Sequence, residues 1–159
     1  RYSGAPVSLG VVSLSQASEI VHVPNDVNEI LDNFPEGSLT IILRARNEMD
    51  SRLGGNKVAV RVVSNRTAKE LLSRTGPLTA TSANISGQEP HLDCVEAAKS
   101  LRSTEESIVG IDGVCEGGQP STLIAWHTVC ESPKSLSIEV IREGKVNSEE
   151  VLSWWKSRI

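Results

Sequence analysis

The sequence predicts an α/β (α+β) fold built on a mixed sheet with flanking helices. Short Val-, Ile- and Leu-rich runs alternate with amphipathic stretches, but without the strict strand–helix–strand rhythm of a doubly wound sheet. Aromatic residues make up only 3% of the chain, so aliphatic side chains must form most of the core. A chain of 159 residues is expected to form one domain, residues 1–159.

The individual elements follow from hydrophobic periodicity and from the residues that flank each run. The predicted strands are short and apolar, and they cover residues 6–14, 39–43, 58–63, 78–81, 107–111, 121–125 and 136–141. The predicted helices each begin at a residue able to cap them: Ser15, Asn25, Ser64, Asp93 and either Asn147 or Ser148. In the strand over 58–63, alternation places Arg61 on the face opposite to Val58, Val60 and Val62.

Composition and charge exclude several classes of protein. The net charge of −4 gives no general attraction to nucleic acid, and no run is long and apolar enough to span a membrane. The three cysteines lack C-x-x-C spacing, so we expect reduced thiols and a cytoplasmic location. The three histidines are scattered, and no metal-ligand pattern is present, so the expected protein-held metal site is none.

Polar side chains gather at the ends of several predicted strands. These are Arg61, the Thr79–Asn84 run, Ser121 with Thr122, and Arg142. Two guanidinium groups converging with several hydroxyls would bind a phosphate or a carboxylate. Each of these residues also has a structural explanation that involves no ligand. Arg61 could form a salt bridge, Ser82 and Asn84 could stabilise a turn, Ser121 and Thr122 could reflect strand propensity, and Arg142 could lie in a surface hairpin.

No nucleophile-based catalytic arrangement is apparent. The sequence lacks a Ser-His-Asp pattern, paired carboxylates at strand ends, G-x-G-x-x-G and the P-loop motif. The catalytic residues therefore stay unknown, and an enzyme of this type would work by positioning its substrates and stabilising charge.

The run Thr81–Gly87 reads Thr-Ser-Ala-Asn-Ile-Ser-Gly and resembles the Ser-x-Asn signature of the YrdC-like family, the threonylcarbamoyl-AMP synthases. Further blocks resemble family motifs in the family order. They are Arg1 with Pro6-Val7 (Lys-x-Arg and Pro-Leu), Phe34–Thr40 (Trp-Pro-Gly-Pro-Leu-Thr), Val58–Arg61 (Val-Gly-Val-Arg), Pro120–Ile124 (Ser-Thr-Val) and Ile141–Gly144 (Leu-Arg-Pro-Gly). Together these blocks span nearly the whole chain.

This resemblance implies a twisted mixed sheet with a concave ligand cavity. It implies that L-threonine, bicarbonate and ATP, accompanied by Mg²⁺, are condensed to threonylcarbamoyl-AMP and pyrophosphate. A partner transferase complex would then modify tRNA. By position, the resemblance assigns ATP to Arg1, Ser82, Asn84 and Arg142, and threonine to Arg61, Ala80 and Ser121, with Thr81 and Thr122 as neighbours.

The chain departs from the family pattern at several positions. It opens on Arg1, so the motif lysine and the family's preceding strand–helix segment are expected to be missing. Glu36, Ser38 and Glu143 stand where the family has proline. The likeness is to the short, single-domain members of the family.

Three alternatives stay open. One is a carbamoyl-adenylate-forming domain, as in the related hydrogenase-maturation carbamoyltransferases. Another is a non-catalytic module that binds double-stranded RNA or tRNA, against which the acidic charge and few aromatics argue. The third is an α/β domain with some other purpose.

Overall fold

The computed structural model describes residues 6–85, 87–102, 108–115, 117–130 and 137–158. The chain separates into two compact units. The larger comprises Pro6–Ala80 and Gln119–Ile159, and the smaller comprises Arg1–Ala5 and Thr81–Gly118. The single domain expected from the length stays a prediction.

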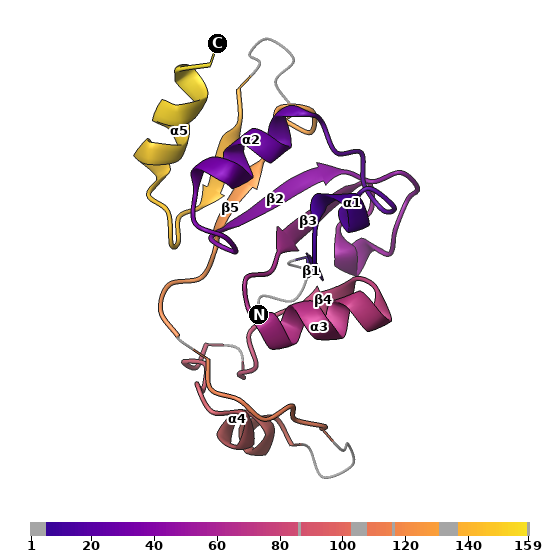
Figure 1. Ribbon diagram of the computed structural model, residues 1–159, viewed down its shortest axis with the longest axis vertical. Helices are drawn as coiled ribbons and strands as arrows, with labels where there is room; N and C mark the ends of the chain where they lie inside the picture. The colour runs from indigo at the N-terminus through magenta and orange to yellow at the C-terminus, as the bar shows by residue number, and fades with distance from the viewer. Residues whose placement is uncertain (1–5, 86, 103–107, 116, 131–136, 159) are drawn as a thin grey trace. The chain divides into compact units, whose positions relative to one another are not determined.

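The larger unit is built on a six-stranded mixed sheet (Figure 1), as the sequence predicts. Its spatial order is β4-β1-β3-β2-β5-β6. The pairs β1–β3 and β2–β5 are parallel, and the other three pairs are antiparallel. The strands are β1 (Ser8–Val11), β2 (Leu39–Arg44), β3 (Lys57–Val62), β4 (Leu78–Ala80), β5 (Thr122–Ala125) and β6 (Glu139–Arg142).

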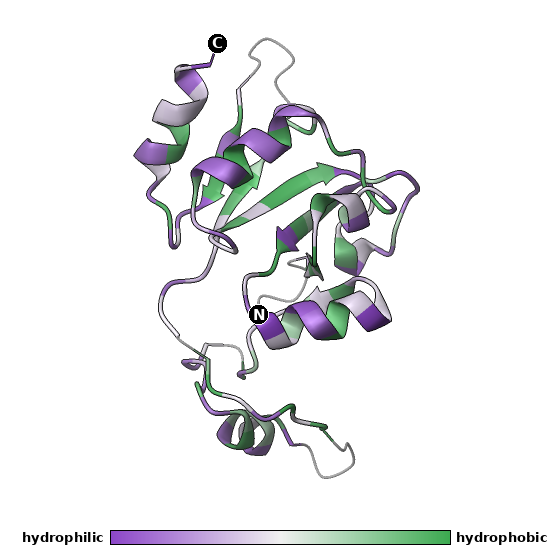
Figure 2. Cartoon of the chain, in the orientation of Figure 1, coloured by the Kyte–Doolittle hydropathy of each residue, from purple (hydrophilic) through white to green (hydrophobic). Residues whose placement is uncertain are grey.

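One face of this sheet forms the hydrophobic core. Helices α1 (Leu14–Ala17), α2 (Asp26–Asn33) and α5 (Ser148–Lys156) pack against it, and Figure 1 shows α2 lying across β2 and β5. Helix α2 buries Val27 and Ile30, which are one turn apart. Figure 2 shows the hydrophobic strands beneath helices whose outer surfaces are hydrophilic. The fully buried strand residues of this core include Val11, Leu43, Val58 and Ile124.

A cluster of aromatic side chains packs helices α2 and α5 against the end of β5. Trp126 Nε1 donates to the Asp26 carboxylate at 3.3 Å, and His127 Nε2 lies 3.2 Å from the other oxygen of that carboxylate. The Trp155 ring meets that of Trp126 edge-on, with 5.3 Å between centroids. Buried aromatic pairs of this geometry add to stability beyond the area they bury.

Helix α3 (Arg66–Thr75) packs on the other face of the sheet, over β1 and β4. The Leu72 side chain reaches Gly10, where a Cβ atom would lie 3.6 Å from Leu72 Cδ1 and 3.5 Å from the Ala80 methyl group. The Gln16 side-chain amide donates to the Leu72 carbonyl oxygen at 3.0 Å. The small side chains at these positions let the helix approach the strands closely.

Local hydrogen bonding corrects two of the predicted helix starts. Ser13, not Ser15, caps α1, since its hydroxyl accepts from the Gln16 backbone N–H at 3.2 Å. Asn65, not Ser64, caps α3. The remaining caps are Asn25 for α2, which makes no side-chain bond, Asp93 for α4 (Cys94–Leu101) in the smaller unit, and Asn147 for α5.

The strand predicted over 107–111 is wrong in its described part. Residues 108–111 are not strand, and Val109 is 89% exposed. Beyond them, Val114 makes one isolated bridge to Asp93. An alternating apolar stretch forms a strand only where a neighbouring strand pairs with it. Strand propensity alone therefore gave a wrong prediction for these residues. No helix in the described part of the chain is long and apolar enough to cross a membrane.

Candidate functional site

Strand register places polar side chains on one face of the sheet, opposite to the core. Arg61 on β3 pairs with Gly10, and Arg142 on β6 pairs with Leu123. Thr40 also pairs with Leu123, so it shares that face. Ser121 precedes Leu123 by two residues, and its hydroxyl bonds that of Thr40. We call Arg61, Thr40, Ser121 and Arg142 the polar row.

The Arg61 guanidinium is half-buried and is held by the chain that leads into β2. Its Nε donates to the Gly37 carbonyl oxygen at 3.0 Å. Burial, and secondarily the positive charge of Arg142, lowers the pKa of Arg61 below its usual range. No acidic ion-pair partner is recorded for Arg61 within the described ranges. Two like charges near one another favour an anionic ligand.

Gly37 is required in this conformation. Its φ is +74°, and a Cβ atom there would lie 2.7 Å from Ser64 Oγ and 3.2 Å from Ser64 N. Only glycine adopts this backbone region without strain and also leaves this space open. The position therefore controls the carbonyl group that holds Arg61.

Ser121 is fixed by two other members of the polar row. Its Oγ lies 2.7 Å from Thr40 Oγ1, and both side chains are buried. Arg142 Nη2 donates to the Ser121 carbonyl oxygen at 2.8 Å. The backbone of Ser121 thus orients one guanidinium group, while its hydroxyl faces a second hydroxyl across the sheet.

The next residue, Thr122, points to the core face and has a structural role. Its hydroxyl donates to the Val146 carbonyl oxygen at 2.6 Å and accepts from the backbone N–H groups of Gly144 and Val146, both at 3.0 Å. A hydroxyl has one donor and two acceptor lone pairs, so that of Thr122 is saturated. It holds the turn after β6 against Ser121.

Glycine is also required in that turn. A Cβ atom at Gly144 would lie 2.0 Å from the Pro120 carbonyl oxygen. The same oxygen accepts from the Lys145 N–H at 2.7 Å. Glu143 turns away toward α5, where its carboxylate accepts from the Ser148 N–H at 2.8 Å. Hydrogen bonding from the Ser148 side chain, and secondarily from its backbone, lowers the Glu143 pKa.

Ala80 ends β4 on the same face, opposite Ser8. The Ser8 hydroxyl donates to the Ala80 carbonyl oxygen at 2.9 Å. Ala80 is half-buried, and any ligand contact that it makes through its methyl group is apolar.

Three predicted residues belong to the smaller unit, namely Thr81, Ser82 and Asn84. Thr81 and Ser82 are exposed. Asn84 Nδ2 donates to the carbonyl oxygens of Ile85, at 3.0 Å, and Gln88, at 2.6 Å. This is the turn chemistry that the sequence left open as an alternative. The Asn84 Oδ1 atom is buried, with no hydrogen-bond partner within the described residues. Arg1 lies outside the described residues.

The sequence alone did not single out Thr40 or Gly37 as site residues. Thr40 is a β-branched residue in a strand, where Thr is common, and its bond to Ser121 joins residues 81 positions apart. A turn glycine is equally commonplace. The two hydroxyl-bearing residues Ser38 and Thr40 lie close together in the sequence, and this was a signal for polar side chains at the site. The signal is ambiguous, because Ser38 Oγ is buried with no hydrogen-bond partner in the described part of the chain.

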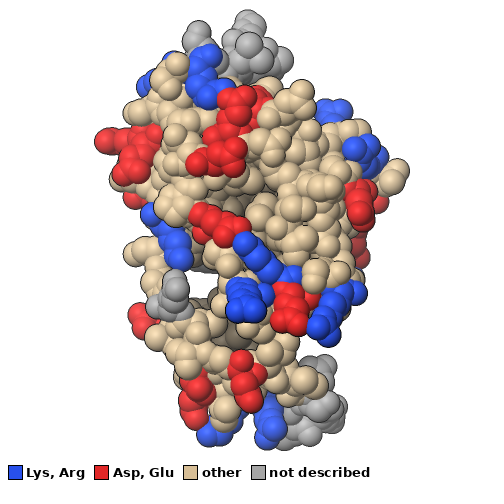
Figure 3. Space-filling view, viewed as in Figure 1, with Lys and Arg blue, Asp and Glu red and all other residues tan. Residues whose placement is uncertain are grey.

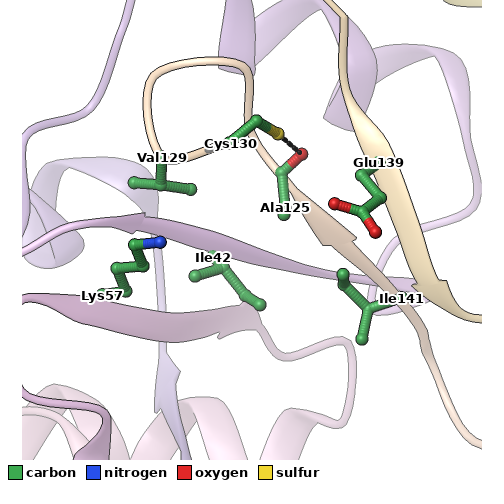
Figure 4. A pocket seen from close by; sticks show the side chains of 7 residues that line it. All are labelled: Ile42, Lys57, Ala125, Val129, Cys130, Glu139 and Ile141. Carbon is green, nitrogen blue, oxygen red and sulfur yellow. Dashed lines mark hydrogen bonds between the residues drawn. The ribbon is translucent and has the colours of Figure 1, made fainter. Parts of the chain in front are cut away.

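A separate pocket of about 260 Å³ lies on the polar-row face of the sheet, toward the other end of β2 and β5 (Figure 4). Cys130 Sγ bonds the Ala125 carbonyl oxygen at 3.6 Å, and burial, with a smaller contribution from Glu139, raises the Cys130 pKa. A protonated thiol is a poor nucleophile. The lining residues are Ile42, Lys57, Ala125, Val129, Cys130, Glu139 and Ile141.

Surface charge on the view in Figure 3 is mixed. Acidic side chains gather over α2 and α5, while acidic and basic ones alternate over α3. This view shows no continuous basic stripe of the kind that tracks a nucleic-acid backbone. In the described residues, no group of three or more His, Cys, Asp or Glu side chains could hold a metal ion.

The Sua5/YciO/YrdC family model, described as telomere recombination, matches residues 1–144. The chain belongs to this family. A Methanocaldococcus jannaschii protein provisionally named threonylcarbamoyl-AMP synthase is 30% identical over 146 residues, which cover 92% of this chain and 66% of the relative. The threonylcarbamoyl-AMP synthase of Dichelobacter nodosus is 31% identical over 106 residues, or 65% of this chain and 54% of that protein.

The fold of the Sua5/YciO/YrdC chain also matches solved structures. The crystal structure of P. abyssi Sua5 complexed with L-threonine matches with a TM-score of 0.75 and 24% identity, over 95% of this chain and 43% of that one. This likeness confirms the predicted α/β fold. The chain spans about two thirds or less of the length of these relatives.

Proposed function

We propose that this chain is an L-threonylcarbamoyladenylate synthase. It would condense L-threonine, bicarbonate and ATP to threonylcarbamoyl-AMP and pyrophosphate, for threonylcarbamoyladenosine modification of tRNA by a partner transferase complex. Family membership and the names of the curated relatives support the reaction class. The observation on which the proposal chiefly rests is the polar row, in which two arginines and paired hydroxyls from separate strands share one face.

In this proposal Arg61 pairs with the threonine carboxylate. The Gly37 carbonyl oxygen engages Nε, so the terminal nitrogens stay available for a two-pronged contact with an anion. Ser121 and Ala80 complete the threonine site. The L-threonine complex of P. abyssi Sua5 supports an amino-acid ligand in a related fold.

The proposed chemistry has two steps. The threonine nitrogen attacks bicarbonate, or carbon dioxide derived from it, to form a carbamate, with release of water in the case of bicarbonate. A carbamate oxygen then attacks the α-phosphorus of ATP, and pyrophosphate leaves. Arg142, with Ser82, Asn84 and Arg1, would bind the nucleotide and offset the charge that develops on its phosphates.

Magnesium enters this proposal only as part of the Mg–ATP substrate. The described residues do not provide an acidic cluster that would fit a resident ion, and ATP-bound Mg²⁺ needs few protein ligands. The chain's own contribution is therefore binding, orientation and charge stabilisation.

The test is pyrophosphate release from ATP and bicarbonate with and without L-threonine, with the product identified by mass. We expect threonine-dependent release. Arg61→Ala should lose about 2 kcal/mol of transition-state stabilisation, roughly 30-fold in kcat/KM for threonine. Arg74→Ala, which removes an exposed arginine paired with Glu70, is the matched control and should retain wild-type turnover.

Two results would contradict the proposal. Release that depends on carbamoyl phosphate instead of threonine would identify a carbamoyl-adenylate-forming domain. Salt-sensitive tRNA binding without any pyrophosphate release would identify an RNA-binding module.

A further inference from the structure

The Thr40–Ser121 pair brings two buried hydroxyl groups together within the polar row. Their oxygens are 2.7 Å apart, and Thr40 and Ser121 are 3% and 5% exposed. Each hydroxyl has one donor and two acceptors. The bond between them uses one donor and one acceptor, so one O–H of the pair is left to bond something else.

Neighbouring hydroxyls differ from this pair. The Thr122 hydroxyl is saturated by three backbone bonds, and the Ser38 hydroxyl makes no bond in the described part of the chain. Of the buried hydroxyls around the start of β5, those of Thr40 and Ser121 form the one side-chain pair recorded among the described residues. The pair is therefore specific rather than a general feature of a Ser- and Thr-rich segment.

The two members of the pair differ in stiffness. Thr40 is β-branched and lies in a central strand between β3 and β5, so its χ1 angle is restricted. Ser121 precedes β5 and has an unbranched side chain. The stiffer residue fixes the position of the more adaptable one, and Thr40 is thus the reference point for the direction of the Ser121 hydroxyl.

We propose that Thr40 is a positioning residue: its hydroxyl orients that of Ser121, and the pair selects an amino acid with a side-chain hydroxyl over one without it. This inference rests on the proposed function. A ligand hydroxyl both donates and accepts, which matches the remaining capacity of the pair. A methyl group in place of the ligand hydroxyl would leave the remaining O–H and acceptor sites of the pair without a partner in a buried setting. Sites of this kind strongly reject a ligand of the same shape that lacks the hydroxyl.

The decisive variant is Thr40→Val, which keeps shape and strand propensity but removes the hydroxyl. We expect the Kd for L-threonine, measured by titration calorimetry, to rise about fivefold to tenfold, in line with one lost hydrogen bond. The preference for L-threonine over L-valine should fall by a similar factor. The KM for ATP and the thermal midpoint should change little. Thr40→Ser should restore most of the affinity.

Two further variants complete the design. Ser121→Ala should lose at least as much affinity as Thr40→Val, because it removes the hydroxyl that Thr40 orients. The double variant should be no worse than Ser121→Ala alone, because Thr40 acts through that hydroxyl. Ser38→Ala is the control, since it removes a buried hydroxyl that bonds neither member of the pair.

The outcomes are separable. A wild-type chain that binds no L-threonine would overturn both the proposed function and this inference. Wild-type binding with an unchanged Kd in Thr40→Val would overturn the inference alone. So would an equal loss toward ATP, or a lower thermal midpoint with unaltered threonine–valine preference, because each marks a merely structural role.

Discussion

Replacing Gly37 with alanine should damage both stability and the placement of Arg61. The backbone φ of +74° is unfavourable for any residue with a Cβ atom. The new methyl group would also lie 2.7 Å from Ser64 Oγ, 3.1 Å from Ser64 Cβ and 3.2 Å from Ser64 N. The side-chain oxygen can rotate away, but the backbone nitrogen cannot, so the loop itself must shift.

The magnitude follows from these two terms. An alanine in the left-handed region costs about 1 kcal/mol, and relieving the contact with Ser64 adds roughly 1–2 kcal/mol. The sum of about 2–3 kcal/mol corresponds to a fall in Tm of roughly 4–12 °C for a protein of this size. The shifted carbonyl group would also weaken its 3.0 Å bond to Arg61 Nε, so the KM for threonine should rise about tenfold.

Two controls separate the terms. Gly55→Ala has a φ of +61° and no heavy atom within 4 Å of the added methyl group, so it should show the backbone cost of about 1 kcal/mol alone. Combining Gly37→Ala with Ser64→Gly removes two of the three close atoms and should recover part of the lost stability. Thermal unfolding followed by circular dichroism, together with threonine kinetics, measures both effects. Equal Tm losses for the Gly37 and Gly55 variants, with an unchanged threonine KM, would refute the reasoning.

Two further predictions test other parts of the molecule. Gly144→Ala places a methyl group 2.0 Å from the Pro120 carbonyl oxygen, so the free energy of unfolding, measured with denaturant, should fall by about 3 kcal/mol or more. Turnover should fall as well, because Ser121 moves. Wild-type stability would contradict the turn geometry. Bonds from Arg52 lower the Asp50 pKa to about 2, so any stabilisation by this pair is present above pH 3.8 and is lost as the pH falls through 2. Carboxyl NMR titration of Arg52→Gln should return the Asp50 pKa toward 3.8, and an unmoved value would exclude Arg52 as the cause.

The sequence predicted the parts of the site that depend on local alternation. Arg61 shares a face with Ala59 and opposes Val58 and Val60, and strand period alone determines that arrangement. The mixed sheet likewise follows from the order and length of apolar runs. These features need no knowledge of which strand pairs with which.

The features that the sequence missed depend on contacts distant in the chain. The hydrogen bond between Thr40 and Ser121 requires β2 and β5 to be neighbours, which no local pattern reveals. The saturated hydroxyl of Thr122 depends on the turn after β6. The predicted start of α1 was wrong for a local reason. Ser13 and Ser15 are equally good caps by residue type, and only backbone geometry distinguishes them.

The strand order has a consequence for how the chain acquires its shape. Adjacent β2 and β5 bring together segments about 80 positions apart, and β6 joins only after them. Closing such long loops is entropically costly, so these pairings should form late and slowly during folding. A chain still being synthesised, with Arg142 not yet outside the ribosome, would lack the complete polar row even with β1, β2 and β3 already paired.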